Sequence, residues 1–69
     1  MSISIGTIVV RRSYCGDIYF YVVDIRGDVA ILKGVFQRLI ADAPIDDLIP
    51  VSEEKKNQLL KIINYLKHD

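Results

Sequence analysis

Two patterns of hydrophobic positions follow one another along the chain, and the change between them falls near residue 52. Before that point, short runs of β-branched and aromatic residues alternate with Gly, Pro and Asp, which is typical of strands joined by tight turns. After it, apolar residues recur at intervals of three and four, which is typical of an amphipathic helix. The pattern therefore predicts a strand-rich region followed by one helix.

Glycine and proline divide the first region into strands. Gly6 opens the first strand, "GTIVVRR", and the turn-like "SYCGD" follows it. The segment "IYFYVVDIRGDVAILKG" predicts two antiparallel strands joined by a tight hairpin at Arg26-Gly27-Asp28. Gly34 ends the third strand, and "VFQRLIADA" predicts a fourth that ends at Pro44, because proline lacks the N–H that a ladder needs.

The predicted helix carries its own start signal. Ser52 is a good N-cap, and Glu53 and Glu54 suit the positive end of the helix dipole. The apolar residues at helical spacing are Leu59, Leu60, Ile62, Ile63 and Leu66. We expect about four turns.

The fold class that these elements predict is mainly β. Residues 1–52 are expected to form a small SH3-like barrel of about five antiparallel strands, with an OB-like barrel as the other form, and residues 53–69 a C-terminal amphipathic helix. Strand alternation predicts a core made of Val9, Phe20, Val22, Ile25, Ala30, Leu32, Leu39, Ala41 and Leu48.

The alternate strand positions are also apolar, although the outer face of a small barrel should be mostly polar. These positions are Ile8, Val10, Tyr19, Tyr21, Val23, Ile31 and Ile40. The C-terminal helix is the nearest segment that could cover them, and a partner surface is the alternative. They are the candidate interaction surface.

Charge argues against a general attraction to nucleic acids or anionic membranes, since Lys plus Arg and Asp plus Glu number nine each. Basic residues do lie among tyrosines on the predicted strands, as in a nucleic-acid-binding groove: Arg11, Arg12, Arg26, Lys33 and Arg38. Their excess over Asp17, Asp24 and Asp28 is small, so the simpler interpretation is that these basic residues are solvent-exposed side chains at the edge of the barrel. A free-standing nucleic-acid-binding module remains the alternative function.

Candidate chemistry is sparse. Cys15 and His68 are the only residues of their types, and a cysteine nucleophile needs a base within hydrogen-bond reach, whereas His68 lies at the chain end. We therefore expect Cys15 to be a turn residue and predict no metal site and no cofactor. A single cysteine and the lack of a signal-like or membrane-spanning run favour an intracellular location.

The stretch "RLIADAPIDDL" brings three carboxylates, Asp42, Asp46 and Asp47, together around a proline. Paired carboxylates act as acid and base only where a cleft separates their pKa values, and no such cleft is indicated. Asp beside Pro is common in turns, where the side chain accepts backbone N–H bonds. We therefore interpret the three carboxylates as structural, with Asp42 in the fourth strand and Asp46 and Asp47 as turn residues after Pro44.

The order of these segments resembles the N-terminal part of the YabG family of sporulation-specific proteases. The elements that carry the resemblance are Ile5-Gly6 with Val9, Arg11 to Tyr14, Val23 to Ile25, Ala30 to Gly34, Arg38-Leu39, Ala41 to Pro44, and Asp47-Leu48. The final segment, "SEEKKNQLLKIINYLKHD", is the least specific section.

The resemblance implies a parent that is a cysteine-type endopeptidase of spore-forming bacteria, acting on spore coat proteins in the mother cell or the coat. It also implies that the catalytic residues lie further downstream, so this chain would not itself be an enzyme and Cys15 would not be the nucleophile. The expected partners are the catalytic region of that protease or coat proteins, with nucleic acid and membrane disfavoured. An isolated fragment is also expected to form a homodimer through the surface that the catalytic region would cover.

Overall fold

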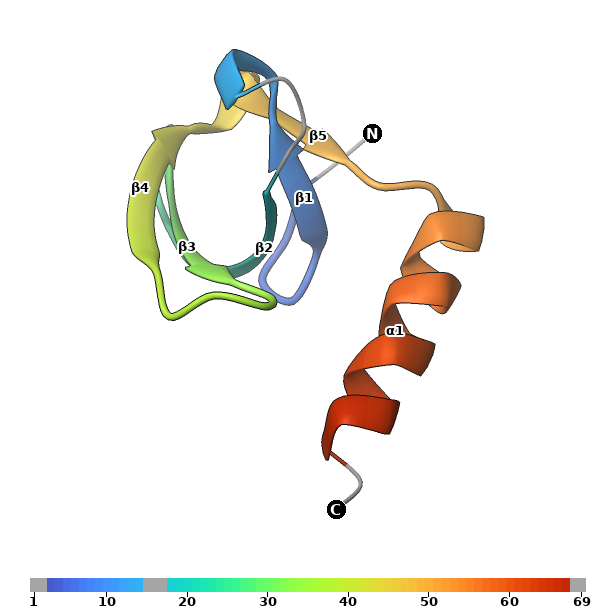
Figure 1. Ribbon diagram of the computed structural model, residues 1–69. Helices are drawn as coiled ribbons and strands as arrows, with labels where there is room; N and C mark the ends of the chain where they lie inside the picture. The colour runs from blue at the N-terminus through green and yellow to red at the C-terminus, as the bar shows by residue number, and fades with distance from the viewer. Residues whose placement is uncertain (1–2, 15–17, 68–69) are drawn as a thin grey trace.

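One antiparallel sheet and one helix make up the chain in the computed structural model, which describes residues 3–14 and 18–67 (Figure 1). The elements in order are β1 (Ile8–Arg11), the 3₁₀ turn η1 (Arg12–Tyr14), β2 (Tyr19–Arg26), β3 (Val29–Gly34), β4 (Ile40–Pro44), the 3₁₀ turn η2 (Ile45–Asp47), β5 (Leu48–Pro50) and α1 (Glu53–Lys67). The predicted class, five antiparallel strands with a C-terminal helix, is confirmed.

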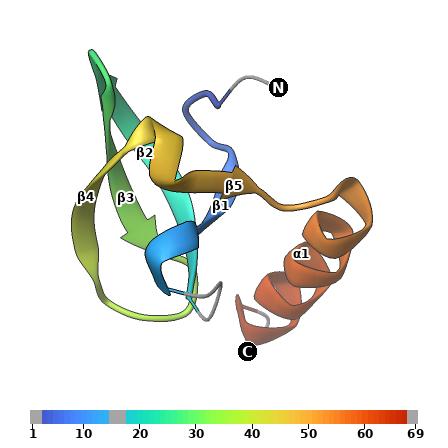
Figure 2. The ribbon, with the colours of Figure 1, turned by 90° about the horizontal axis from the view of Figure 1, so that it is seen from above.

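The strand order is β4-β3-β2-β1-β5, and every neighbouring pair is antiparallel. Seen from above, the sheet curls around its inner face (Figure 2). It does not close, because within residues 3–14 and 18–67 β4 and β5 each pair with a strand on one side only. The chain passes from β4 to β5 through the η2 corner and not through a ladder, so "barrel" describes the curl loosely.

The core lies on the inner face of the curled sheet. Its members are Val9, Phe20, Val22, Ala30, Leu32, Ala43 and Leu48. The strand register stacks them in rows, with Val9 opposite Phe20 and Val22 opposite Leu32. Six of the nine predicted core residues belong to this cluster. They were found because side chains on one face of a strand recur every second residue.

The fourth strand begins later than predicted. Residues 35–39 form a loop, in which the Gly34 N–H donates to the Leu39 carbonyl at 2.8 Å. Leu39 is 36% exposed, so its assignment to the core was wrong. Ala41 and Ile25 are only half-buried, while Ala43 is fully buried instead. The alternation of inner and outer positions along β4 was predicted correctly. The strand itself begins at Ile40, five residues after the predicted start at Val35.

Glycine makes two of the turns. The β2–β3 hairpin turns at Gly27, whose φ of 62° lies in the left-handed region that glycine reaches without a steric penalty. At Gly34 the requirement is space, since a Cβ there would lie 2.5 Å from the backbone oxygen of Gln37. Only glycine allows the loop after β3 to fold back this closely.

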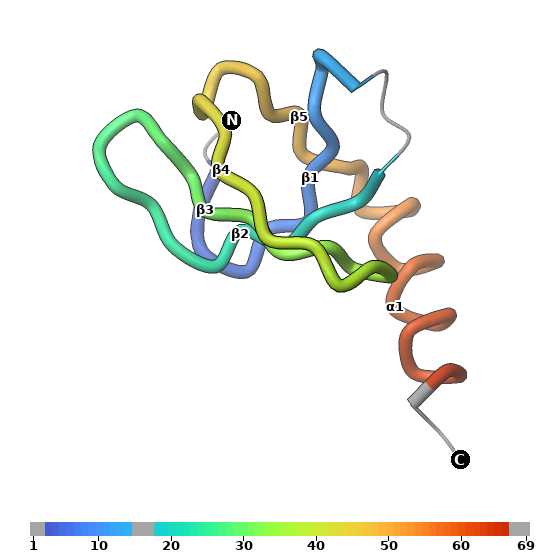
Figure 3. The backbone as a smooth tube through the Cα atoms, turned by 60° about the vertical axis from the view of Figure 1, so that its left-hand side comes forward, coloured from blue at the N-terminus to red at the C-terminus, as the bar shows by residue number. Residues whose placement is uncertain are grey.

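The helix begins at Glu53, and Ser52 caps it as predicted: the Lys55 N–H donates to the Ser52 Oγ at 3.1 Å. It lies beside the β1 side of the sheet and extends beyond it, as Figures 1 and 3 show. Leu59 is 3% exposed and is buried outside the core cluster, and the Lys55 Nζ lies 5.7 Å from the centre of the Tyr19 ring. The helix therefore packs on the outer face of the sheet.

Candidate functional site

The best-organised polar cluster joins the end of β1 to η2. The Arg11 Nε donates to Asp47 Oδ2 at 2.9 Å, and the Ser13 Oγ donates to the same oxygen at 2.7 Å. The Ser13 N–H donates to Asp47 Oδ1 at 3.0 Å, and the Arg11 guanidinium lies 4.4 Å from the centre of the Tyr14 ring. We call this group the Arg11–Asp47 clasp.

Its electrostatics are those of a structural pair. The hydrogen bond from the Ser13 hydroxyl, and then that from Arg11, hold the pKa of Asp47 below its ordinary value, against partial desolvation that raises it. A carboxylate whose charged form is stabilised in this way accepts protons poorly, whereas a general base at neutral pH needs a raised pKa. The clasp therefore has a structural role, in which it links the end of β1 and η1 to η2.

The other acids of "RLIADAPIDDL" are separated. Asp42 lies on β4 with its side chain exposed, and Asp46 is exposed on η2. Asp47 accepts a backbone N–H, as a turn residue does, but from Ser13, 34 positions away, and not from its own turn. The structure places Asp46 and Asp47 in a turn, in agreement with the sequence interpretation, and Asp42 in a strand.

Asp24 makes a second, more exposed pair. A β-bulge interrupts the β2–β3 register between Val22 and Asp24. The Asp24 carboxylate accepts from the Arg26 Nε at 3.0 Å and from the Ile25 N–H at 2.9 Å, and these bonds, the Arg26 bond first, lower its pKa. This carboxylate is thus also engaged by its own strand.

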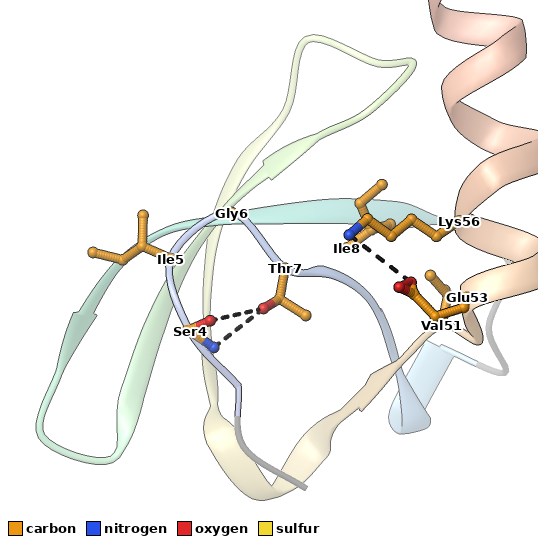
Figure 4. A pocket seen from close by; sticks show the side chains of 8 residues that line it. All are labelled: Ser4, Ile5, Gly6, Thr7, Ile8, Val51, Glu53 and Lys56. Atoms are coloured by element: carbon orange, nitrogen blue, oxygen red, sulfur yellow. Dashed lines mark hydrogen bonds and ion pairs between the residues drawn. The ribbon is translucent and has the colours of Figure 1, made fainter.

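A shallow pocket of about 330 Å³ lies where the turn before β1 meets the start of α1 (Figure 4). The Ser4 and Thr7 hydroxyls lie 3.2 Å apart on one side, and on the other the Lys56 Nζ lies 4.0 Å from the Glu53 carboxylate. The ammonium faces a carboxylate of its own helix, and the hydroxyls face one another. Within residues 3–14 and 18–67, no basic side chain forms a hydrogen bond with the Ser4 or Thr7 hydroxyl. The described part of the pocket therefore contains no pair of nucleophile and general base.

Cys15 and His68 lie outside the described residues, so their predicted roles stay predictions from the sequence. Across the part of the chain that the structure describes, no group of three or more His, Cys, Asp or Glu side chains is placed to hold a metal ion. Over the same residues, no helix combines the length and the apolar character needed to cross a bilayer.

The residues of the candidate interaction surface share the outer face of the sheet. Ile8 pairs with Tyr21, and Tyr21 with Lys33, which pairs with Ile40 on β4. Burial decreases along this row from β1 to β4, since Ile8 is 2% exposed whereas Ile40 is 66% exposed. Val10, Tyr19, Tyr21 and Ile31 are half-buried, and Val23, on the bulge, is exposed. The β4 side of the outer face is therefore the open side.

Two further apolar regions were missed from the sequence. The loop after β3 exposes Phe36 and Leu39 next to Ile40. The far end of α1 exposes Ile62, Tyr65 and Leu66, of which Tyr65 is 80% exposed. The signal for the second region was present, because the helical apolar positions cover more than one face of the helix.

Comparison with known families then gives the class of protein. A family model of peptidases matches residues 4–68, which is nearly the whole chain. The chain belongs to this family, the YabG peptidase U57 family, and the resemblance drawn from the sequence is confirmed. No curated protein and no solved structure matches the chain.

Proposed function

We propose that this chain is a non-catalytic docking domain of a sporulation-specific cysteine-type endopeptidase that processes spore coat proteins. Its partners would be the catalytic region of that peptidase or the coat proteins themselves, in the mother cell or the spore coat. Family membership over residues 4–68 supports the peptidase relationship. A curled sheet of five short antiparallel strands suits a binding role, since its loops and sheet faces are open to partners.

The observation that carries the docking role is the amount of large apolar surface that the fold leaves open. The exposed large apolar residues on the sheet and the loop after β3 include Val23, Val29, Phe36, Leu39, Ile40 and Ile49, and those on α1 are Ile62, Tyr65 and Leu66. Small soluble domains bury such residues when they can, and clusters that stay exposed mark interaction sites. The isolated chain is accordingly expected to dimerise through this surface.

The polar groups support a non-catalytic role. Among residues 3–14 and 18–67, the carboxylates with a shifted pKa are Asp24 and Asp47, and hydrogen bonds within the fold lower the pKa of both. Catalytic acids and bases at neutral pH need shifts in the opposite direction. These carboxylates therefore contribute to the structure of the domain and not to peptide hydrolysis.

Two assays test this proposal. The purified 69-residue chain should hydrolyse no coat protein, and cleavage that disappears in Cys15→Ser would overturn the proposal. The full-length peptidase without residues 1–52 should keep hydrolysing a short unstructured peptide but lose most of its activity on folded coat protein. Equal activity of both forms on coat protein would show that the domain does not dock.

The alternative function, nucleic-acid binding, has its own readout. A salt-dependent mobility shift of labelled RNA or DNA at micromolar chain would favour it, because phosphate contacts weaken steeply with ionic strength. We expect no such shift, since the chain carries equal numbers of acidic and basic residues.

A further inference from the structure

The two edges of the open sheet differ in the hydrogen bonds that they can offer. Two backbone hydrogen bonds fix the alternation along β4: Gly34 N–H to Leu39 C=O at 2.8 Å, and Ile45 N–H to Asp28 C=O at 2.8 Å. In an antiparallel ladder the residues that bond to one neighbour alternate with those that point away from it. Residues 39, 41, 43 and 45 therefore bond toward β3, whereas Ile40 and Asp42 direct their N–H and C=O groups away from it. We call these outward groups the β4 edge.

The β5 edge has no comparable donors. Val51 N–H bonds to the Ile8 carbonyl at 3.1 Å, so the residues of β5 that point away from β1 are Leu48 and Pro50. The Leu48 N–H is already donated to the Ile45 carbonyl at the end of η2, and Pro50 has no N–H. Only the β4 edge can both donate to and accept from an added strand.

Side chains around the β4 edge leave room for those of a partner. A shallow pocket of about 260 Å³ lies on the outer face, lined by Ile31, Ile40, Ala41 and Asp42. On the inner face, β4 contributes only the small side chains of Ala41 and Ala43. A strand beside β4 would thus place apolar side chains against Ile40 outside and beside the alanines inside.

We propose that the β4 edge binds an extended segment of a partner polypeptide as a sixth, antiparallel strand. The segment carries a basic residue opposite Asp42, an apolar residue opposite Ile40, and one small or β-branched residue between them. Ile40 and Asp42 each exchange an N–H and a C=O with it, so affinity comes from the backbone and selectivity from the side chains. This inference rests on the proposed docking function and names the surface and the chemistry of its partner.

Asp42 gives the β4 edge its selectivity. Its exposed carboxylate would stand directly opposite one side chain of the added strand, where an opposite charge stabilises and a like charge destabilises pairing. Asp42 and the terminal Pro44 also disfavour uncontrolled edge-to-edge pairing, as charged and proline residues do on natural sheet edges. The same residues therefore exclude wrong strands and favour a basic one.

Amide hydrogen exchange on the ¹⁵N-labelled 69-residue chain tests the edge itself. The amides of Ala41 and Ala43, bonded within the ladder, should exchange slowly, and those of Ile40 and Asp42 should exchange fast. Equal protection of all four amides would overturn the proposal, because the β4 edge would then be already occupied.

A capped hexapeptide, acetyl-Thr-Val-Lys-Val-Ile-Thr-amide, tests occupancy. At millimolar peptide we expect the largest amide shifts at Ile40 and Asp42, with slowed exchange at both. Methylating the backbone nitrogens of its Lys and Ile should abolish the shifts, whereas methylating those of the two Val residues, which face away, should not.

A charge swap provides the matched control. Asp42→Lys should weaken binding of the Lys peptide and strengthen binding of the same peptide with Glu in place of Lys, each by about two- to fivefold at low salt. Unchanged affinities would overturn the proposal, as would shifts centred on α1. Concentration-dependent slowing of amide exchange at both Ile40 and Asp42 without peptide would assign the edge to a second copy of the chain and also overturn the proposal. Dimerisation through the apolar face alone would leave both amides fast to exchange.

The docking function and the β4 edge can fail separately. If removal of residues 1–52 abolishes coat-protein cleavage but Asp42→Lys in the full-length peptidase leaves it unchanged, the domain docks through another surface. If neither change affects cleavage, the docking function itself is wrong.

Discussion

Leu59 is the residue through which we expect α1 to be held on the sheet. Its side chain is 3% exposed, whereas Leu66, seven residues later and therefore on nearly the same helix face, is 62% exposed where α1 extends beyond the sheet. Replacing either leucine by alanine preserves helix propensity, so the two substitutions differ mainly in burial.

Truncating a buried leucine costs about 2–5 kcal/mol in unfolding free energy. Leu59 lies at a helix–sheet contact flanked by the half-buried Leu60 and Ile63, where neighbours can relax, so we expect the lower end, about 2 kcal/mol. For a domain of this size that corresponds to a loss of roughly 8–16 °C in Tm. Leu66→Ala should change stability by less than about 0.5 kcal/mol.

Urea unfolding followed in parallel by helical ellipticity and by tyrosine fluorescence measures both variants. Coincident transitions that move together in Leu59→Ala would show that α1 and the sheet unfold as one unit. If Leu59→Ala and Leu66→Ala have equal, small effects, Leu59 does not anchor the helix and our reasoning from its burial is wrong. If the transition in helical ellipticity shifts to lower urea while the fluorescence transition does not, α1 detaches while the sheet stays folded.

Three further predictions concern the polar and turn residues. Because the folded pKa of Asp47 is lowered, its bond to Ser13 stabilises above the ordinary carboxyl pKa of about 3.9 and is lost as pH falls through the folded value. Asp47→Asn should therefore lower the urea midpoint at pH 7, and the difference from the parent should shrink as pH falls through the folded pKa of Asp47. A constant difference across pH would contradict the assignment. Gly34→Ala should cost about 1–3 kcal/mol, since its Cβ would meet the Gln37 carbonyl, and a thermal melt indistinguishable from the parent would show that the loop yields freely. Ser52→Ala should cost about 1 kcal/mol through loss of the helix cap, with Ser52→Asp restoring it; failure of that rescue would argue against capping.

Local signals in the sequence predicted the parts of the fold that are locally determined. The β2–β3 hairpin is encoded where it forms, because Gly27 supplies the positive φ, and Ser52 marks the start of the helix within one residue. The start of β4 was missed because residues 35–39 are as apolar as a strand. Their loop conformation depends on the fold-back at Gly34 and on the bond from Val35 N–H to the Tyr19 carbonyl, which no local pattern shows.

The candidate site was predicted less completely. The outer-face alternation was read correctly, but which of its residues α1 covers depends on where the helix lies, so the buried Ile8 and the exposed Ile40 were not distinguishable. The Arg11–Asp47 pair joins positions 36 residues apart, a separation at which no spacing rule applies. The outward hydrogen-bonding groups of β4 follow from register, which the sequence alone does not give.

The Arg11–Asp47 clasp also sets an order of events during folding. The β2–β3 hairpin closes a short loop and can form within microseconds, whereas Arg11 and Asp47 meet only after the intervening three strands have been placed. We therefore expect the clasp to form after the transition state, so its removal should speed unfolding while leaving the folding rate nearly unchanged. In chevron kinetics, Arg11→Met should raise the unfolding rate constant and leave the refolding rate constant nearly unchanged. The clasp would then set the lifetime of the folded domain.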